Sequence, residues 1–226
     1  MIKMIPYHKF LLLLSITLLL LGCAKTKSLT DASASQPTLS HEETVISWQQ
    51  KLNEEYLSED AGLSPLSESQ RKIFGEAGGH PFYPIDEAFK VVAKMDRNVD
   101  ETGVGFETST DRVAIYDVYA IAHFQLEGKD YAVKIYQSPT MRRIPGYRDH
   151  LFFPFNDLTN GATTYGGGRY VDLTIPEGNE LVIDFNQAYS PYCAYSDKYS
   201  CPVPPRENFI NAEVQAGVKL LDKIVK

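Results

Sequence analysis

Two cysteines, Cys193 and Cys201, lie in a run of tyrosines, prolines and short polar residues, FNQAYSPYCAYSDKYSCPVPPREN. This composition is typical of a long loop. Two thiols in one loop could form a disulfide, bind a metal or act as a nucleophile. The seven residues between them exceed the spacing of about two to four found in zinc ligand pairs, and no histidine is close in sequence. We therefore favour a disulfide over a metal site, keep free thiols, inert or reactive, as the alternative, and expect no metal and no cofactor.

Asp172 and Asp184 are a second candidate pair. Side chains alternate along a strand, so Asp172, Asp184 and Asn186 are predicted to share one face of a hairpin. On adjacent strands the two carboxylates would lie roughly 5 to 8 Å apart, where they could share a proton or bind a cation. A solvated polar face is the alternative.

Arg169 follows three glycines and falls on the apolar face of the same predicted strand. An arginine in that position can extend its charge to solvent, pair with an acid below the surface, or point its guanidinium into a pocket. Glu207 and Asp157 are the acids that the loops could bring near it. We expect the pocket, in which Arg169 would hold an anionic group.

Two helices are expected to precede the strands. Ser40 and Glu43 have the form of a capping box, and apolar residues then recur at helical spacing, which predicts a helix over residues 40–57. A short second helix is predicted over residues 68–74.

Strands occupy most of the remaining chain. Alternation predicts a strand over residues 89–95, and short turns predict two hairpins, residues 114–126 with 131–137 and residues 168–174 with 180–186. The last segment also fits the spacing of one helix face, but we favour a last strand over residues 210–216. Strands joined by hairpins form antiparallel sheets. We therefore predict a mainly β fold, a sandwich or partly closed barrel, with the two helices packed at one side.

The start of the chain has the features of a bacterial export signal. Lys3 and Lys9 precede an apolar run, residues 10–21, that is too short to span a bilayer, and Leu20-Leu21-Gly22-Cys23 resembles a lipobox. We expect a signal peptide over residues 1–22, lipidation of Cys23, a flexible tether over residues 23–40 and one β-rich domain over residues 41–226. The protein would then be anchored in the bacterial cell envelope and would face the periplasm.

The formal net charge is −7, and no cluster of lysine and arginine is present. An acidic chain of this kind repels nucleic acid, so we expect no nucleic-acid partner.

Several longer segments are similar to one bacterial family, the domain of unknown function 1684. They are LTNG at residues 158–161, TYGGGRYVDL at 164–173, DFN at 184–186, PYCAY at 191–195 and YSCPVPPREN at 199–208. The resemblance spans about residues 43–217 and implies no settled activity. It implies that these segments form one site, to which Tyr165, Arg169, Asp172, Asn186, Cys193, Cys201, Glu207 and Asn208 would contribute.

Two classes of function remain open. The first is a lipoprotein that binds a small polar or anionic ligand, or an envelope partner, near Tyr165, Arg169, Cys193 and Glu207. Tyrosines of the long loop, Tyr192 among them, could stack on a flat ligand or pack the loop against the domain. The second is a hydrolase-like enzyme that uses the paired carboxylates, Arg169 and a free thiol. A deep pocket with a perturbed carboxylate would favour the enzyme, and a shallow aromatic surface would favour the binder.

Overall fold

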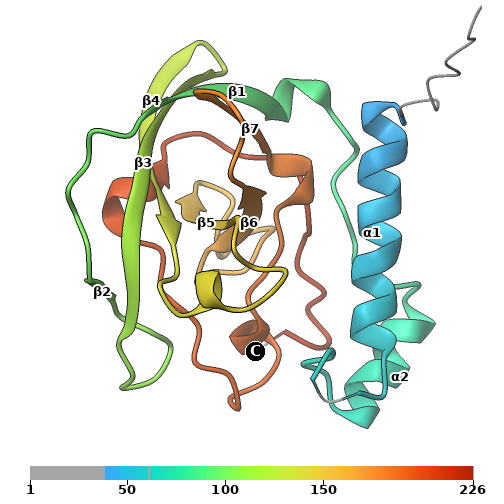
Figure 1. Ribbon diagram of the computed structural model, residues 1–226. Coiled ribbons are helices and arrows are strands. Elements are labelled where there is room, and N and C mark those ends of the chain that lie inside the picture. The colour runs from blue at the N-terminus through green and yellow to red at the C-terminus, as the bar shows by residue number, and fades with distance from the viewer. Residues whose placement is uncertain (1–38, 61, 226) are drawn as a thin grey trace, which may run out of the picture. The chain divides into compact units, whose positions relative to one another are not determined.

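The computed structural model describes residues 39–60 and 62–225 of the chain. The predicted signal peptide, Cys23 and most of the tether lie outside these residues. No helix within the described residues is long and apolar enough to cross a membrane. Figure 1 shows a curled sheet with two helices at one side.

The two helices begin where their capping residues predict. Helix α1 (His41–Leu57) and helix α2 (Glu68–Glu76) each start with a complete capping box, formed by Ser40 with Glu43 and by Ser67 with Gln70. The apolar side of α1 packs with α2 and the C-terminal part of the chain, in a cluster that includes Tyr56, Phe74, Tyr195 and Val218.

Eight strands form one curled sheet, whose order is β6-β5-β4-β3-β1-β7, with β2 on β3 and β8 on β5. All pairings are antiparallel except that of β5 with β8. The strands are β1 (Lys90–Asp96), β2 (Val104–Phe106), β3 (Ala114–Leu126), β4 (Lys129–Gln137), β5 (His150–Asp157), β6 (Arg169–Thr174), β7 (Glu180–Asp184) and β8 (Phe209–Ile210). The mainly β, partly closed architecture predicted from the sequence is confirmed.

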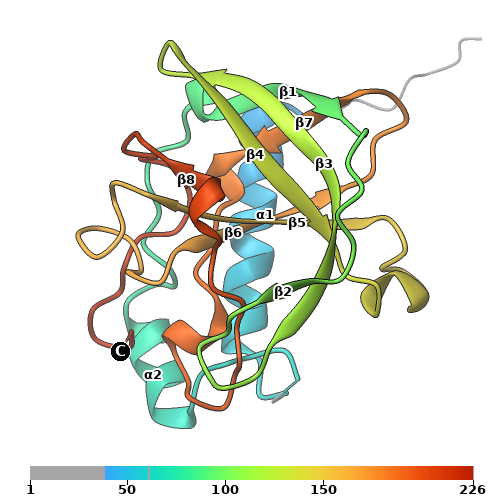
Figure 2. The ribbon, with the colours of Figure 1, turned by 90° about the vertical axis from the view of Figure 1, so that its left-hand side faces the viewer.

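The hairpin of β3 and β4 is confirmed, and its turn is tighter than expected. Leu126 pairs with Lys129, so only Glu127 and Gly128 lie between the strands. Both have positive φ, 50° and 74°, as a two-residue turn requires in order to match the twist of its strands. The bend of the long ribbon is visible in Figure 2.

The second predicted hairpin, between the segments that form β6 and β7, is wrong. All six residues of β6 pair with β5, and β7 pairs with β1, about ninety residues earlier in the chain. The alternation within the two strands is nevertheless correct, because Val171, Leu173, Leu181 and Ile183 are all buried. A short connection between two strands does not require them to pair when each has a longer complementary partner elsewhere.

The last predicted strand is also mostly wrong. Only Phe209 and Ile210 form β8, although Ala212, Val214 and Ala216 continue the buried alternation. The reason is that the carbonyls of this segment bond to other groups: the amide of Leu158 donates to that of Ala212, and the Arg169 side chain donates to those of Val214 and Ala216.

Candidate functional site: an aromatic cleft between helix α1 and the cysteine loop

Arg169 does not face a pocket, which corrects our expectation. Its side chain is 0% exposed, and Nη2 lies 2.7 Å from Oδ2 of Asp157, whose side chain is equally buried. Nη2 also donates to the carbonyl of Val214 at 2.8 Å, and Nη1 donates to that of Ala216. The guanidinium is therefore a structural group of the interior, and it links β6 to the C-terminal segment.

The three glycines before Arg169 form a bend in which the backbone packs closely. Gly168 has φ +92°, and a Cβ built there would lie 2.8 Å from the carbonyl oxygen of Phe155. Its amide donates back to Tyr165 O. The bend thus leads the chain into β6.

Glu207 and Asn208 lie beside β4 rather than beside Arg169. The Glu207 carboxylate is 3.5 Å from Nζ of Lys134. Asn208 is fully buried, and its side-chain amide bonds to both backbone groups of Lys134 and to the carbonyl of Pro154. It holds the C-terminal segment against the sheet. The structure therefore does not bring all the family signature residues into one site.

Asp184 and Asn186 form a buried polar cluster with the start of α1. Oδ1 of Asp184 accepts from the backbone and side-chain amides of Asn186, and Oδ2 lies 2.8 Å from Nε2 of His41. Asn186 also bonds to both backbone groups of Asp86. These hydrogen bonds tie α1 to the end of β7.

Asp172 has different hydrogen-bond partners from Asp184. His150 Nε2 lies 3.0 Å from its Oδ1, and Tyr189 Oη donates to its Oδ2 at 2.9 Å. The carboxylate is thereby fixed while its side chain stays 51% exposed. Because β6 and β7 do not pair, the proposed proton-sharing arrangement on adjacent strands is wrong, although both carboxylates line one shallow cavity of about 340 Å³.

Cys193 and Cys201 are free thiols in contact with each other. The backbone amide of Cys193 donates to Sγ of Cys201 at 3.2 Å. The hydrogen bond from the Cys201 thiol lowers the pKa of Cys193 to about 6, assisted by Ser109 and Tyr165, although partial burial opposes this. The same bond, together with burial, raises the pKa of Cys201. Tyr165 and the two cysteines, which the family resemblance assigned to one site, therefore do lie together.

A cleft of about 420 Å³ lies beside these thiols. Its walls are α1, β6 and the cysteine loop, by which we mean the segment 185–208 that contains Cys193 and Cys201. Its volume is in the range of small-molecule sites. Cys201 and Asp172 are the predicted site residues on its wall together with Tyr192. The aromatic side chains that line it are Trp48, Tyr170, Tyr189, Tyr192 and Tyr199.

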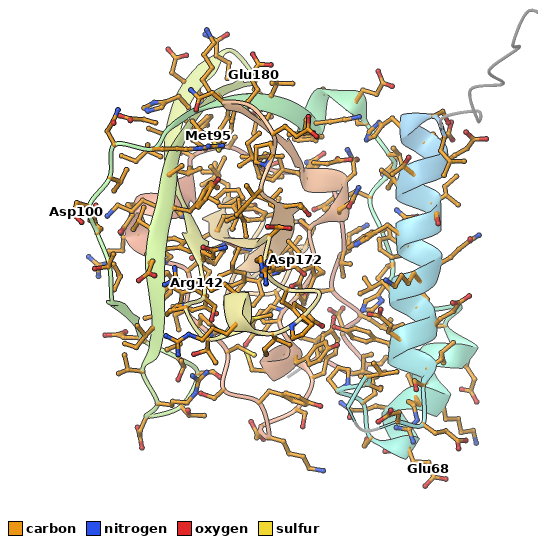
Figure 3. The ribbon with its side chains drawn as sticks, in the orientation of Figure 1. Glu68, Met95, Asp100, Arg142, Asp172 and Glu180 are labelled. Carbon is orange, nitrogen blue, oxygen red and sulfur yellow. The ribbon has the colours of Figure 1, made fainter. Side chains whose placement is uncertain are left out.

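The lining of the cleft combines large ring surfaces with few charges. Pro191 and Pro202 add to the apolar wall, and Lys51, Glu55 and Asp172 supply the formal charges. Lys51 and Glu55 lie one helical turn apart on α1, with their charged atoms 4.0 Å from each other. Figure 3 labels Asp172, which projects from β6.

The carboxylates of the cleft wall exert a negative potential on its tyrosines. Burial and then the Glu55 carboxylate, with a contribution from Asp172, raise the pKa of Tyr192 to about 12. Burial and then Asp172 raise the pKa of Tyr189. The phenols are therefore neutral hydrogen-bonding groups at physiological pH.

Trp48, Tyr170 and His150 were not identified as site residues from the sequence. Trp48 has the helical spacing of a core residue, and Tyr170 falls by alternation on the strand face that carries Asp172. The alternation of side chains along a strand predicts which residues share a face. It does not predict which element covers that face, and α1 and β6 come together only in the tertiary fold. No group of three or more potential metal-ligating side chains lies together within the described residues.

Comparison with known proteins gives a family and similar solved structures. The family model described as "Protein of unknown function (DUF1684)" matches residues 78–219. The solution NMR structure of an uncharacterised protein from Haloarcula marismortui shares 33% sequence identity with the chain, covering 80% of this chain and 95% of its own, with a TM-score of 0.61. No curated protein matches. The family match includes β6 and the cysteine loop and begins after α1, which forms the other wall of the cleft.

Proposed function

The chain belongs to the DUF1684 family of proteins of unknown function, and we propose that this member is an envelope lipoprotein that binds a small ligand in the cleft between α1 and the cysteine loop. The observation that carries the proposal is the cleft itself. Five aromatic side chains and two prolines line a hollow of about 420 Å³, with a fixed, half-exposed carboxylate at one side. Sites for small molecules commonly combine such apolar walls with a few oriented polar groups.

The polar group in this cleft is held in place. Asp172 accepts hydrogen bonds from Tyr189 and pairs with His150, so its position is set before any ligand arrives. Preorganisation of this kind reduces the entropy lost on binding. It supports recognition of a ligand rather than a merely solvated face.

The proposed anchor rests on the sequence before the described residues. Leu20-Leu21-Gly22-Cys23 would direct lipidation of Cys23, and two or more acyl chains make membrane attachment stable. The tether would then lead to Ser40, where α1 begins and supplies one wall of the cleft. We place the protein at a bacterial membrane, with the domain in the periplasm.

The binding proposal is favoured over the hydrolase because the residues proposed for catalysis are dispersed. Arg169 is enclosed with Asp157, and Asp184 is engaged with His41 and Asn186. Neither lines the cleft beside Cys201 and Asp172.

Binding is tested by ligand-observed NMR with a library of small polar and aromatic compounds, using the full-length lipoprotein in maltoside micelles. Trp48→Leu and Tyr192→Leu should each weaken any hit about tenfold, because they remove ring surface while keeping an apolar side chain. Phe209→Leu is the control, since Phe209 is exposed on β8 and does not line the cleft. Hits that bind all three variants and the wild type equally would contradict the assignment of the cleft.

The anchor is tested by expression in a bacterial host with Cys23→Ala as the comparison. We expect the wild type to partition into detergent and to carry the mass of the acyl groups, and the variant to lose both properties. A variant that remains acylated and membrane-bound would contradict the proposal.

A further inference from the structure

We infer that the cleft is a cage for a methylated ammonium group, such as the quaternary ammonium of choline; this rests on the proposed function and names the ligand chemistry. A cation of this kind binds where the negative faces of several aromatic rings surround it. It carries no N–H groups, so it needs ring faces and a nearby negative charge rather than hydrogen-bond acceptors. The cleft offers both.

Two pairs of rings in the cleft wall pack perpendicular to each other. Tyr192 and Tyr199 meet at 76° with centroids 5.1 Å apart, and Tyr170 and Tyr189 meet at 89° with centroids 5.9 Å apart. In an edge-to-face pair, the ring that contributes its edge keeps both faces uncovered by its partner. Trp48 adds the ring type that binds cations best.

The charge balance of the wall also fits a cation. Lys51, Glu55 and Asp172 are the charged lining residues, and Lys51 is offset by Glu55 one helical turn away, which leaves the charge of Asp172. Both carboxylates act on the phenol of Tyr192, so their negative potential reaches the aromatic wall.

Two other ligand classes fit less well. Both oxygens of Asp172 are engaged by His150 and Tyr189, and no cluster of metal-ligating side chains exists in the described part of the chain, so a bare metal ion lacks ligands. An anion would meet Lys51 as the single cationic residue among the lining side chains that the structure describes.

The decisive comparison is between choline and 3,3-dimethylbutan-1-ol, which has the same shape without the charge. Titration calorimetry uses the full-length lipoprotein in maltoside micelles at low salt, because detergents with choline head groups would compete. We expect choline to bind about tenfold more tightly than the alcohol, which corresponds to the strength of a desolvated cation–π contact.

Two variants test the parts of the cage. Asp172→Asn should reduce choline affinity about five- to tenfold and leave the alcohol unchanged, because it removes the charge but keeps the shape. Trp48→Leu should weaken choline more than the alcohol. Asp100→Asn is the matched control, because Asp100 is exposed and lies far from α1, as Figure 3 shows.

A third probe separates the two sources of the group. If phosphocholine binds more tightly than choline, the result supports the cage with a lipid head group as its ligand. If choline binds as tightly as phosphocholine or more tightly, the result supports the cage with a free small cation as its ligand.

Equal binding of choline and the alcohol would overturn the cation cage while leaving the cleft as a site for neutral ligands. Absence of choline binding would also overturn it, and the compound library would then decide separately whether the cleft binds anything.

Discussion

Arg169 and Asp157 form an ion pair in the interior, with 2.7 Å between Nη2 and Oδ2 and no exposure of either side chain. The same guanidinium donates to two carbonyls of the C-terminal segment, at Val214 and Ala216. An arginine side chain thus takes the place that a neighbouring strand would occupy. This explains why a segment with strand-like alternation is not a strand.

Arg169→Met should destabilise the fold by about 3 to 5 kcal/mol, because it leaves the Asp157 carboxylate buried without its counter-charge. The loss is measured as the free energy of unfolding in urea. The double variant Arg169→Met with Asp157→Asn should recover part of the loss, since no uncompensated charge then remains.

A double variant as unstable as the single one would show that the carbonyl contacts, rather than the charge pair, carry the effect. A single variant of wild-type stability would contradict the burial of the pair.

Local pattern predicted the helices, the β3–β4 hairpin and the buried faces of the strands, because capping boxes, turns and alternation act over a few residues. It did not predict which strands pair across the sheet. The link between β6 and β7 has the length of a hairpin, yet β5 offers β6 a partner along its whole length. Such a choice depends on the competition among all strands.

The candidate site shows the same division. Sequence reasoning selected Cys201, Asp172 and Tyr192, which line the cleft, but joined them to Arg169 and Glu207, which do not. Arg169 was assigned the apolar face of its strand correctly, and the error was to expect a pocket there instead of the interior. The alternation of side chains along one strand does not show whether an acidic partner is buried together with the arginine.

His80 should make stability depend on pH below about 6.5. It is buried among Tyr56, Phe74 and Tyr195, and this burial lowers its pKa to about 3. The neutral ring fits its partners if Nδ1 donates to Asn53 Oδ1 and Nε2 accepts from the Tyr195 hydroxyl.

The sign follows from the two protonation states. As pH falls from about 6.5 towards about 3, the unfolded chain binds a proton at His80 and the folded chain does not, so the folded state loses about 1.4 kcal/mol per pH unit relative to the unfolded state. Urea unfolding of the wild type and His80→Gln between pH 4 and pH 7 should differ in slope by about this amount. His123→Gln, at an exposed site on β3, is the control. Parallel curves for wild type and His80→Gln would refute the prediction.

The periplasmic location that we propose predicts that the cysteine pair oxidises to a disulfide. The two thiols are already hydrogen-bonded to each other, and an oxidising compartment favours a disulfide between two such cysteines. Mass analysis of protein isolated without reductant should show a loss of two hydrogens that links the peptides of Cys193 and Cys201. In the entropic model this short loop contributes roughly 2 to 3 kcal/mol. Recovery of both thiols in the free state would contradict the prediction.

In the reduced protein, Cys193 should react as a thiolate and Cys201 should not. The Cys201 thiol donates to Cys193 and lowers its pKa to about 6, while the same bond raises the pKa of Cys201. Alkylation by iodoacetamide, followed by peptide mass analysis, should therefore modify Cys193 first, with a midpoint near pH 6. Cys201→Ala should move that midpoint towards the ordinary value for cysteine, and Tyr165→Phe should move it by a smaller amount because Tyr165 supplies a lesser hydrogen bond. Equal rates at the two cysteines, with a midpoint near 8.5, would mean that the contact does not polarise the pair.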